Sequence, residues 1–210
     1  MQNANEAGNA FMLAGAHDLV IRNNVLKAFK HINTGGGGNS RLTIVNNTFG
    51  SDLSFPVEHW PVGIGLEDCP NSTVKNNIFY NLPGAIYYIT GSSWDGLSAG
   101  NNLAFRADGR APSGEPFPGD MWGVDPGFRD PAGDWHLKAG SACVDAGAPL
   151  GDLVPNDYYG VSRPQGKGLD VGACELEGST PAAPAPQSPQ PVPQTRTTVC
   201  SPYPQCLLRR

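Results

Sequence analysis

One stretch of this chain places a carboxylate, an imidazole and an indole side by side, at Glu58, His59 and Trp60. Sugar rings stack on aromatic faces and their hydroxyl groups bond to carboxylates and imidazoles, so this trio is suited to lining a glycan groove. It lies within residues 51–61, which lengthen one repeat of the chain. Such insertions map to loops on one face of a repeat protein, often the binding face. The alternative is a surface loop whose indole covers the core.

Two further charged features could act on a sugar. Glu67 and Asp68 are adjacent carboxylates, and paired carboxylates serve as acid and base in glycosidases or bind calcium. Neighbouring strand residues point to opposite faces, which suits binding better than paired catalysis. Lys75 could contact a uronate, but no acidic cluster adjoins it as a lyase would require. We therefore treat Glu67, Asp68 and Lys75 as candidate glycan-binding residues and predict no catalytic residue.

These candidates must be positioned by a repeated sequence motif, here called the asparagine phrase, which is an alternating apolar run that ends in an asparagine pair. The pairs are Asn23-Asn24, Asn46-Asn47, Asn76-Asn77 and Asn101-Asn102. A period of roughly 20–50 residues predicts a stacked repeat architecture. Asparagine tolerates the left-handed conformation of sharp turns, and amides stacked in register can bond from coil to coil. We therefore interpret all eight asparagines as turn formers and rungs of a structural ladder.

A second apolar segment precedes each following phrase, so that one coil contains three short strands. Period-2 alternation with Val, Ile, Thr and Phe favours strands over helices. We predict an all-β fold, a right-handed single-stranded parallel β-helix over residues 1–104, with coils stacked at about 4.8 Å. A leucine-rich repeat has a similar period, but it requires upstream leucines and a helical half-repeat that this sequence does not show.

The repeat stops after residue 104, and the rest of the chain divides into three parts. Residues 105–124 are rich in Pro and Gly and predict a loop, and residues 178–210 predict a Pro-rich disordered tail. Residues 125–177 predict a segment that caps the open end of the β-helix and satisfies its strand edges. In this segment Asp145 and Asp170 are expected to cap turns, and Arg163 to bond to a carboxylate.

Composition excludes several classes of function. A net charge of -5 without a basic stripe argues against nucleic acid as a partner, and no apolar run is long enough for a membrane span. The sequence predicts no cofactor or metal. Calcium is possible but unsupported, because the run from Gly35 to Gly38 lacks the paired Asp spacing of a calcium-binding repeat. The N-terminus does not resemble a signal peptide, and the repeat is already running near residue 10. We therefore expect the C-terminal piece of a longer protein, with further β-helix coils upstream.

Five cysteines occur, too few for a disulfide scaffold. Cys143 and Cys174 fall in two C-terminal motifs that could meet. A disulfide between them is one interpretation, and buried or free thiols are the other.

The coils and a set of C-terminal motifs together resemble a known family. The motifs read Asp125-Pro-Gly-Phe, Asp134-Trp-His-Leu, Ser141-Ala-Cys-Val-Asp-Ala-Gly, Arg163-Pro-Gln-Gly and Asp170-Val-Gly-Ala-Cys-Glu. Over residues 10–177 the chain resembles pectate-lyase-like, right-handed β-helix repeats of secreted bacterial proteins. In those proteins a similar closing segment precedes a variable anchor or sorting tail.

This resemblance implies a secreted or cell-surface protein that acts on or adheres to polysaccharide. It does not imply one activity, because the fold hosts lyases, hydrolases, adhesins and phage tailspikes. We expect a non-catalytic module that binds polysaccharide. The alternative is the C-terminal part of a polysaccharide lyase or glycoside hydrolase whose catalytic coils lie mostly upstream.

Overall fold

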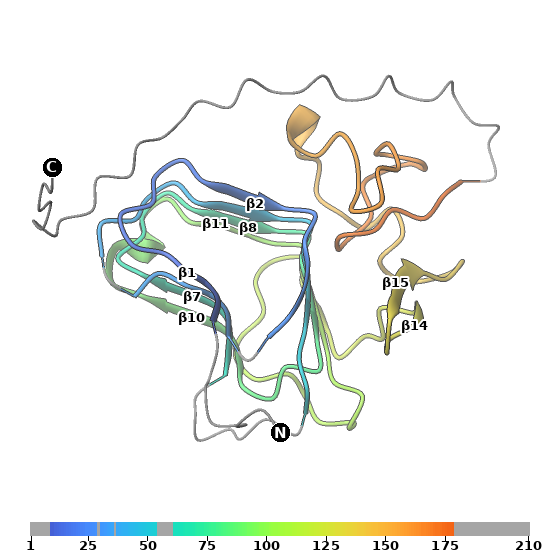
Figure 1. Cartoon of the computed structure of the whole chain (residues 1–210), viewed down its shortest axis with the longest axis horizontal. Coiled ribbons are helices and arrows are strands. Elements are labelled where there is room, and N and C mark those ends of the chain that lie inside the picture. Colours follow the sequence, from blue (N-terminus) through green and yellow to red (C-terminus); the bar gives the residue numbers. More distant parts are fainter. Residues whose placement is uncertain (1–8, 29, 36, 54–60, 179–210) are drawn as a thin grey trace, which may run out of the picture. The chain divides into compact units, whose positions relative to one another are not determined.

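The computed structural model describes residues 9–28, 30–35, 37–53 and 61–178, which form stacked parallel sheets wound into a β-helix (Figure 1). Each coil contributes one strand to each of three sheets, and the strands of neighbouring coils pair in parallel register. In Figure 1, β2, β8 and β11 lie together in one sheet, and β1, β7 and β10 in another. The predicted all-β, parallel β-helix is confirmed.

The strands are assigned as follows. The first sheet contains β1 (Asn9–Met12), β4 (Lys30–Asn33), β7 (Val62–Glu67) and β10 (Ala85–Thr90). The second sheet contains β2 (Val20–Arg22), β5 (Thr43–Val45), β8 (Thr73–Lys75) and β11 (Ser98–Gly100). The third sheet contains β3 (Val25–Lys27), β6 (Thr48–Gly50), β9 (Ile78–Tyr80), β12 (Leu103–Phe105) and β13 (Met121–Trp122). The antiparallel pair β14 (Phe128–Asp130) and β15 (Asp134–Leu137) and the 3₁₀ helices η2 (Gly91–Trp94) and η3 (Gly151–Leu153) complete the fold.

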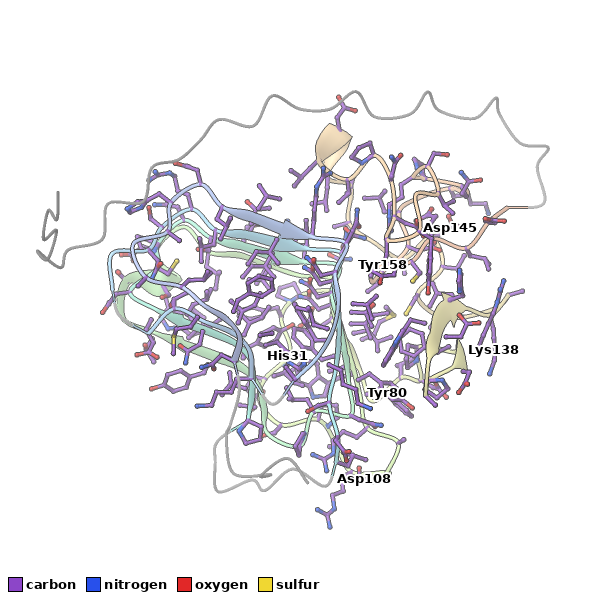
Figure 2. All side chains as sticks on the ribbon, in the orientation of Figure 1. His31, Tyr80, Asp108, Lys138, Asp145 and Tyr158 are labelled. Atoms are coloured by element: carbon purple, nitrogen blue, oxygen red, sulfur yellow. The ribbon has the colours of Figure 1, made fainter. Side chains whose placement is uncertain are left out.

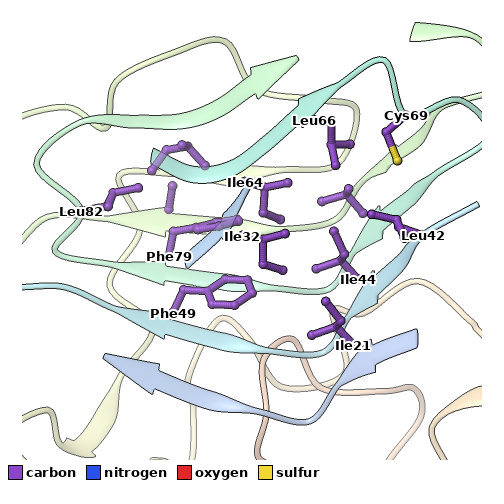
Figure 3. Packing of buried hydrophobic residues seen from close by; sticks show 13 residues of the cluster. Ile21, Ile32, Leu42, Ile44, Phe49, Ile64, Leu66, Cys69, Phe79 and Leu82 are labelled. Carbon is purple, nitrogen blue, oxygen red and sulfur yellow. The ribbon is translucent and has the colours of Figure 1, made fainter. Parts of the chain in front are cut away.

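An apolar column fills the inside of the coils, because inward residues stack in register. Ile21, Ile44 and Val74 form one row of the second sheet. In the third sheet the rings of Phe49 and Phe79 lie 5.3 Å apart (Figure 3). Full burial of such a side chain stabilises the fold by about 1.5–3 kcal/mol. A single coil cannot bury its inward face, so stacking is what produces this stability.

The two asparagines of each pair have different roles. The first of each pair has a positive φ between 51° and 58° and makes the sharp turn between two strands; these residues are Asn23, Asn46, Asn76 and Asn101. Asparagine is among the few residues with a side chain that adopt this left-handed conformation readily. The second of each pair forms the ladder described next.

The ladder is a continuous chain of hydrogen bonds between the coils. Asn77 Oδ1 accepts hydrogen bonds from the backbone N and the Nδ2 of Asn47, both at 3.0 Å. Asn77 in turn donates from its own N and Nδ2 to Asn102 Oδ1, both at 2.9 Å. Asn24 bonds to Asn47 in the same way, at 3.0 and 2.9 Å. Each buried polar group left without such a partner would cost about 1–3 kcal/mol.

Residues 112–122 close the C-terminal end of the column, a role that we expected of residues 125–177. Ile86 N donates to Ser113 O at 3.0 Å, and the ring of Phe117 packs against Tyr87 with centroids 5.0 Å apart. Trp122 then continues the inward row of the third sheet by pairing with Ala104. The predicted Pro/Gly loop is therefore a partial fifth coil that covers the apolar column.

Residues 125–178, here called the lateral segment, run along the outside of the coils. The outward side chains Ile78 and Leu103 of the third sheet pack with Phe128 and Leu137 of the lateral segment. The strands β6 and β9 are thereby buried on both faces. Strands of a sheet that is covered on both faces have continuous apolar sequences, as β9 has in Ile78-Phe-Tyr.

The turn asparagines hold the lateral segment in place. Asn46 Nδ2 donates to Asp170 O at 2.8 Å and Gly172 O at 3.3 Å. Asn76 exchanges two hydrogen bonds with the backbone of Ala148, at 2.9 and 2.7 Å. Asn76 O also accepts from Gly172 N at 2.7 Å. The first asparagines of the pairs are thus turn formers that also dock a distant part of the chain.

A buried ion pair supports this docking from the other side. Arg163 and Glu175 are 2.9 Å apart, with side chains 0% and 1% exposed. The guanidinium also donates to Asp170 O and Gly172 O, the carbonyl groups that Asn46 contacts. The expected Arg–carboxylate pair is present, and it shapes the lateral segment. Asp145, labelled in Figure 2, accepts from Gly168 N within the same segment.

His31 lies inside the column, fully buried (Figure 2). One ring nitrogen, Nε2, lies 2.8 Å from Gly50 O, and Nδ1 has no partner among the described residues. Burial lowers the pKa of His31 to about 4. The imidazole is therefore neutral near pH 7, and Nε2–H donates to the carbonyl group.

We predict that Asn77→Ala destabilises the fold by at least about 3 kcal/mol, because it leaves several buried polar groups of neighbouring rungs unpaired. Asn101→Gly is the matched control, since glycine keeps the left-handed turn and Asn101 is outside the ladder. Urea unfolding at pH 7.5 measures both. Equal losses in the two variants would contradict the ladder's role.

We predict that stability falls as pH decreases from about 6.5 to 4, because the unfolded state then binds a proton at His31 that the folded state excludes. A pKa difference of this size corresponds to about 3 kcal/mol. Asp170 and Glu175, whose pKa values burial raises, act in the opposite sense. His31→Gln keeps an N–H donor and does not titrate, so the difference between the two urea-unfolding pH profiles isolates His31. Parallel profiles would contradict this prediction.

We predict that Glu175→Ala costs about 3–5 kcal/mol, because it leaves the buried guanidinium of Arg163 unpaired. Replacing both partners, as Arg163→Met with Glu175→Leu, should cost less than Glu175→Ala alone. Urea unfolding of Arg163→Met, of Glu175→Leu and of the double variant measures the coupling energy between the two residues. Additive losses would show that the pair does not act as a unit.

Candidate functional site

An open groove of about 160 Å³ lies over the first sheet. It is lined by Lys30 and Asn33 of β4, Val62, Gly65 and Glu67 of β7, and Tyr88 of β10. The other two sheets meet the lateral segment instead, through Val45 in the second sheet and Ile78 in the third. The groove therefore lies over the first sheet. Its outward residues Asn33, Gly65 and Tyr88 are not in the apolar clusters that join the other two sheets to the lateral segment.

The floor of the groove is one row of outward residues in register. Met12 pairs with Asn33, Asn33 with Gly65, and Gly65 with Tyr88. Gly65 has no Cβ, so the row is lowest between the amide of Asn33 and the ring of Tyr88. A Cβ at Gly65 would lie 3.6 Å from Asn33 Oδ1, an ordinary contact, so the backbone does not require glycine there. The hollow follows from the side chains present in this row.

The polar groups beside this floor are held by short local bonds. Asn33 Oδ1 accepts a hydrogen bond from Gly35 N at 2.9 Å, which fixes the amide plane. Glu67 N donates to Thr34 Oγ1 at 2.7 Å, which ties the end of β7 to the neighbouring coil. A Cβ at Gly35 would meet both Asn33 Oδ1 at 3.3 Å and Glu67 Oε1 at 3.8 Å. The carboxylate and the amide therefore lie near the same turn.

The groove combines an aromatic ring, a carboxylate, an amide and an ammonium group. Tyr88, 39% exposed, places an aromatic ring at the groove. Glu67 supplies acceptor oxygens, and Lys30 supplies an ammonium donor. Asn33 offers an amide that can donate and accept. Such a site can hold hydroxyl and carboxylate groups of a glycan at the surface of a rigid sheet.

The structure separates the residues that the sequence singled out. Glu58, His59 and Trp60 lie outside the described residues, in the stretch before Val62 of the groove. Glu67 lines the groove. Asp68 has a φ of 47° and accepts hydrogen bonds from Ser92 at the adjoining turn.

Lys75 lies in the second sheet, where it pairs with Val45 and Gly100. Lys75 is therefore not brought together with Glu67, which belongs to the first sheet. Its row also contains Arg22, whose guanidinium donates to Leu153 O of the lateral segment. This row contacts the lateral segment and is separate from the groove.

Sequence reasoning missed Lys30, Asn33, Gly65 and Tyr88 as a site. A signal was available for three of them, because Asn33, Gly65 and Tyr88 each lie in the apolar segment that precedes the next asparagine pair. Aligning these segments coil on coil would have placed Asn33, Gly65 and Tyr88 in one outward row. The sequence instead favoured Glu58, His59 and Trp60, because charged and aromatic side chains are adjacent there.

A second, smaller cavity of about 80 Å³ lies in the lateral segment. It is lined by Arg129, His136, Leu137, Glu175, Leu176 and Glu177. His136 Nδ1 lies 2.5 Å from Asp134 Oδ1, and this hydrogen bond holds the pKa of Asp134 below its usual range. The imidazole also stacks on Tyr159, with centroids 4.1 Å apart. These bonds orient the ring as part of the packing of the segment.

The cysteines of the described chain are free thiols. Cys143 packs in the cluster with Ile78 and Val171, and it does not form the bridge to Cys174 that was one of our two interpretations. Burial raises the pKa of both thiols to about 12. Both therefore stay protonated near neutral pH, and a thiol makes a poor nucleophile.

Two features are absent from the described residues. No cluster of three or more His, Cys, Asp and Glu side chains is placed to hold a metal ion there. In the same residues no helix is both long and apolar enough to cross a bilayer.

The geometry of the groove and of the coils can be compared with known proteins. No model of a protein family, no curated protein and no solved structure matches this chain.

Proposed function

We propose that this chain is a secreted or cell-surface β-helix module that binds polysaccharide in the groove over the first sheet. The observation that carries the proposal is the row of Asn33, Gly65 and Tyr88, flanked by Lys30 and Glu67. An aromatic face beside an amide, a carboxylate and an ammonium group suits a pyranose and its substituents.

The repeat architecture supports binding to a polymer. A solenoid presents extended, regular surfaces, and proteins with this architecture use them to bind long ligands. Coil insertions map to binding faces, and the longer coil of this chain enters the groove at Val62. The pectate-lyase-like resemblance of the coils and the closing motifs points to the same class of ligand.

Binding is favoured over catalysis by the carboxylates of the groove. Glycosidases place two carboxyl groups about 5–9.5 Å apart across the scissile bond. Among the described lining residues Glu67 alone carries a carboxylate, and Asp68 is engaged with Ser92. The second candidate function, the C-terminal part of a polysaccharide lyase or glycoside hydrolase, would require catalytic groups beyond these residues.

We predict that one glycan in a panel of uronate and neutral polysaccharides binds the chain, and that Tyr88→Ala weakens this binding by about tenfold. Loss of an aromatic anchor of this kind is worth about 1.4 kcal/mol. Gly65→Leu should abolish binding, because the new side chain fills the hollow without a backbone clash. Affinity gel electrophoresis and calorimetry measure both effects.

Tyr158→Ala is the matched control, since Tyr158 is an exposed aromatic of the lateral segment, remote from the groove residues. It should bind like the unmodified chain, and urea unfolding should show that all variants are folded. Binding that survives both Gly65→Leu and Tyr88→Ala would place the site elsewhere. Release of unsaturated products or reducing ends that is lost in Glu67→Gln would favour the enzyme.

A further inference from the structure

The asparagine ladder has a direction. Every rung donates from its backbone N and its Nδ2, and the acceptor is always the Oδ1 of the rung in the following coil. The chain of bonds runs from Asn24 through Asn47 and Asn77 to Asn102. At the C-terminal end, Asn102 therefore needs an acceptor for its two N–H donors. At the N-terminal end, the Oδ1 of Asn24 can accept hydrogen bonds from a further donor.

The C-terminal end is terminated by a carboxylate. Asp120 Oδ1 accepts from the N of Asn102 at 2.8 Å and from its Nδ2 at 3.2 Å. The other oxygen, Oδ2, accepts from Phe117 N at 2.8 Å and from the hydroxyl of Tyr87 at 3.0 Å. An ionised carboxylate only accepts hydrogen bonds, so Asp120 ends the ladder without leaving a surplus donor. Residues 112–122 cover the column at this end.

The N-terminal end lacks such a terminator among the described residues. Asn24 uses its Nδ2 on Asn47 Oδ1 and on Arg22 O. Its Oδ1 receives no hydrogen bond from any described residue, whereas the Oδ1 of Asn47 and of Asn77 each receive two. The first rung therefore presents an acceptor that matches the donors of one more asparagine.

Inward apolar side chains of the first coil are less buried than their counterparts in the next coil. Leu19 is 36% exposed, although the corresponding Leu42 of the next coil is fully buried. Phe11 and Leu26 are half-buried, whereas their partners in the next coil, Ile32 and Phe49, are fully buried. The strands β1, β2 and β3 are also the edge strands of their sheets in the described chain. Exposed apolar groups beside open strand edges are a surface that favours strand addition.

We propose that this N-terminal face docks one further parallel β-helix coil that carries asparagine at its corner. The three edge strands accept its three strands, and the Oδ1 of Asn24 accepts hydrogen bonds from its asparagine. The inference is independent of the glycan site, which lies on the outer face of the first sheet.

The polarity of the ladder excludes a second copy of this chain as the occupant. Head-to-tail stacking would bring the carboxylate of Asp120 to Asn24 Oδ1, so that acceptor meets acceptor. Two N-terminal faces in contact would bring a second Asn24, whose N and Nδ2 already donate to Asn47 and Arg22 within its own chain. Neither arrangement supplies the missing donor, whereas an asparagine coil supplies two.

The test is a chain with residues 9–29 duplicated between Gly8 and Asn9, so that the added coil carries its own Asn-Asn pair. Two matched variants carry a substitution in the copy of Asn24 only: Asn24→Asp in one and Asn24→Leu in the other. Hydrogen exchange of the β1, β2 and β3 amides and the thermal unfolding midpoint are measured for all forms.

With the asparagine copy, exchange in β1, β2 and β3 should slow at least tenfold and the midpoint should rise by several degrees. The Asp and Leu copies should give less than a third of either gain, because they lack the side-chain N–H. Equal protection by Asn and Asp copies overturns the proposal. An added coil that exchanges freely while residues 61–178 stay protected also overturns it.

The unmodified chain provides an independent measurement. Sedimentation should find it monomeric over a wide concentration range. Self-association that protects the β1, β2 and β3 amides would show that a second copy occupies this face, and would overturn the choice of occupant.

Discussion

The internal amide ladder is the constraint on which the rest of the structure depends. Each coil must turn sharply between its second and third strands, and that turn carries polar groups into the interior. Unpaired, they would cost about 1–3 kcal/mol apiece. The bonds of Asn47 and Asn77 to their neighbours pair them only when the coils are stacked in register. Register then aligns the rows of Ile and Phe that fill the column.

The same corner also fixes the position of the lateral segment. Because the second asparagine of each pair turns inward, the first is left with its amide available to the outside. Asn46 and Asn76 use these amides on the backbone of residues 148–172. The buried pair of Arg163 and Glu175 holds the receiving backbone in shape. The third sheet is covered as a result, and the groove lies over the first sheet.

The groove and the open end of the column illustrate two different uses of a repeat. In the groove, equivalent positions of successive coils carry three different residue types, Asn33, Gly65 and Tyr88. At the two ends of the column the ladder meets different polar groups. Asp120 stops the ladder because its carboxylate has no N–H, and Asn24 leaves an acceptor.

The sequence by itself determined the parallel β-helix, the positions of the coils and the Arg–carboxylate pairing of residues 125–177. Period, alternation and turn residues are local signals, and they predict local structure. The tertiary structure decided which of Asn76 and Asn77 faces inward, which segment closes the column and which sheets the lateral segment covers. Residues 112–122 cap the column, and residues 125–178 lie along its side, because outward Ile78 and Leu103 need an apolar cover. The groove likewise depends on which residues of distant coils are neighbours, and that is settled only when the coils stack.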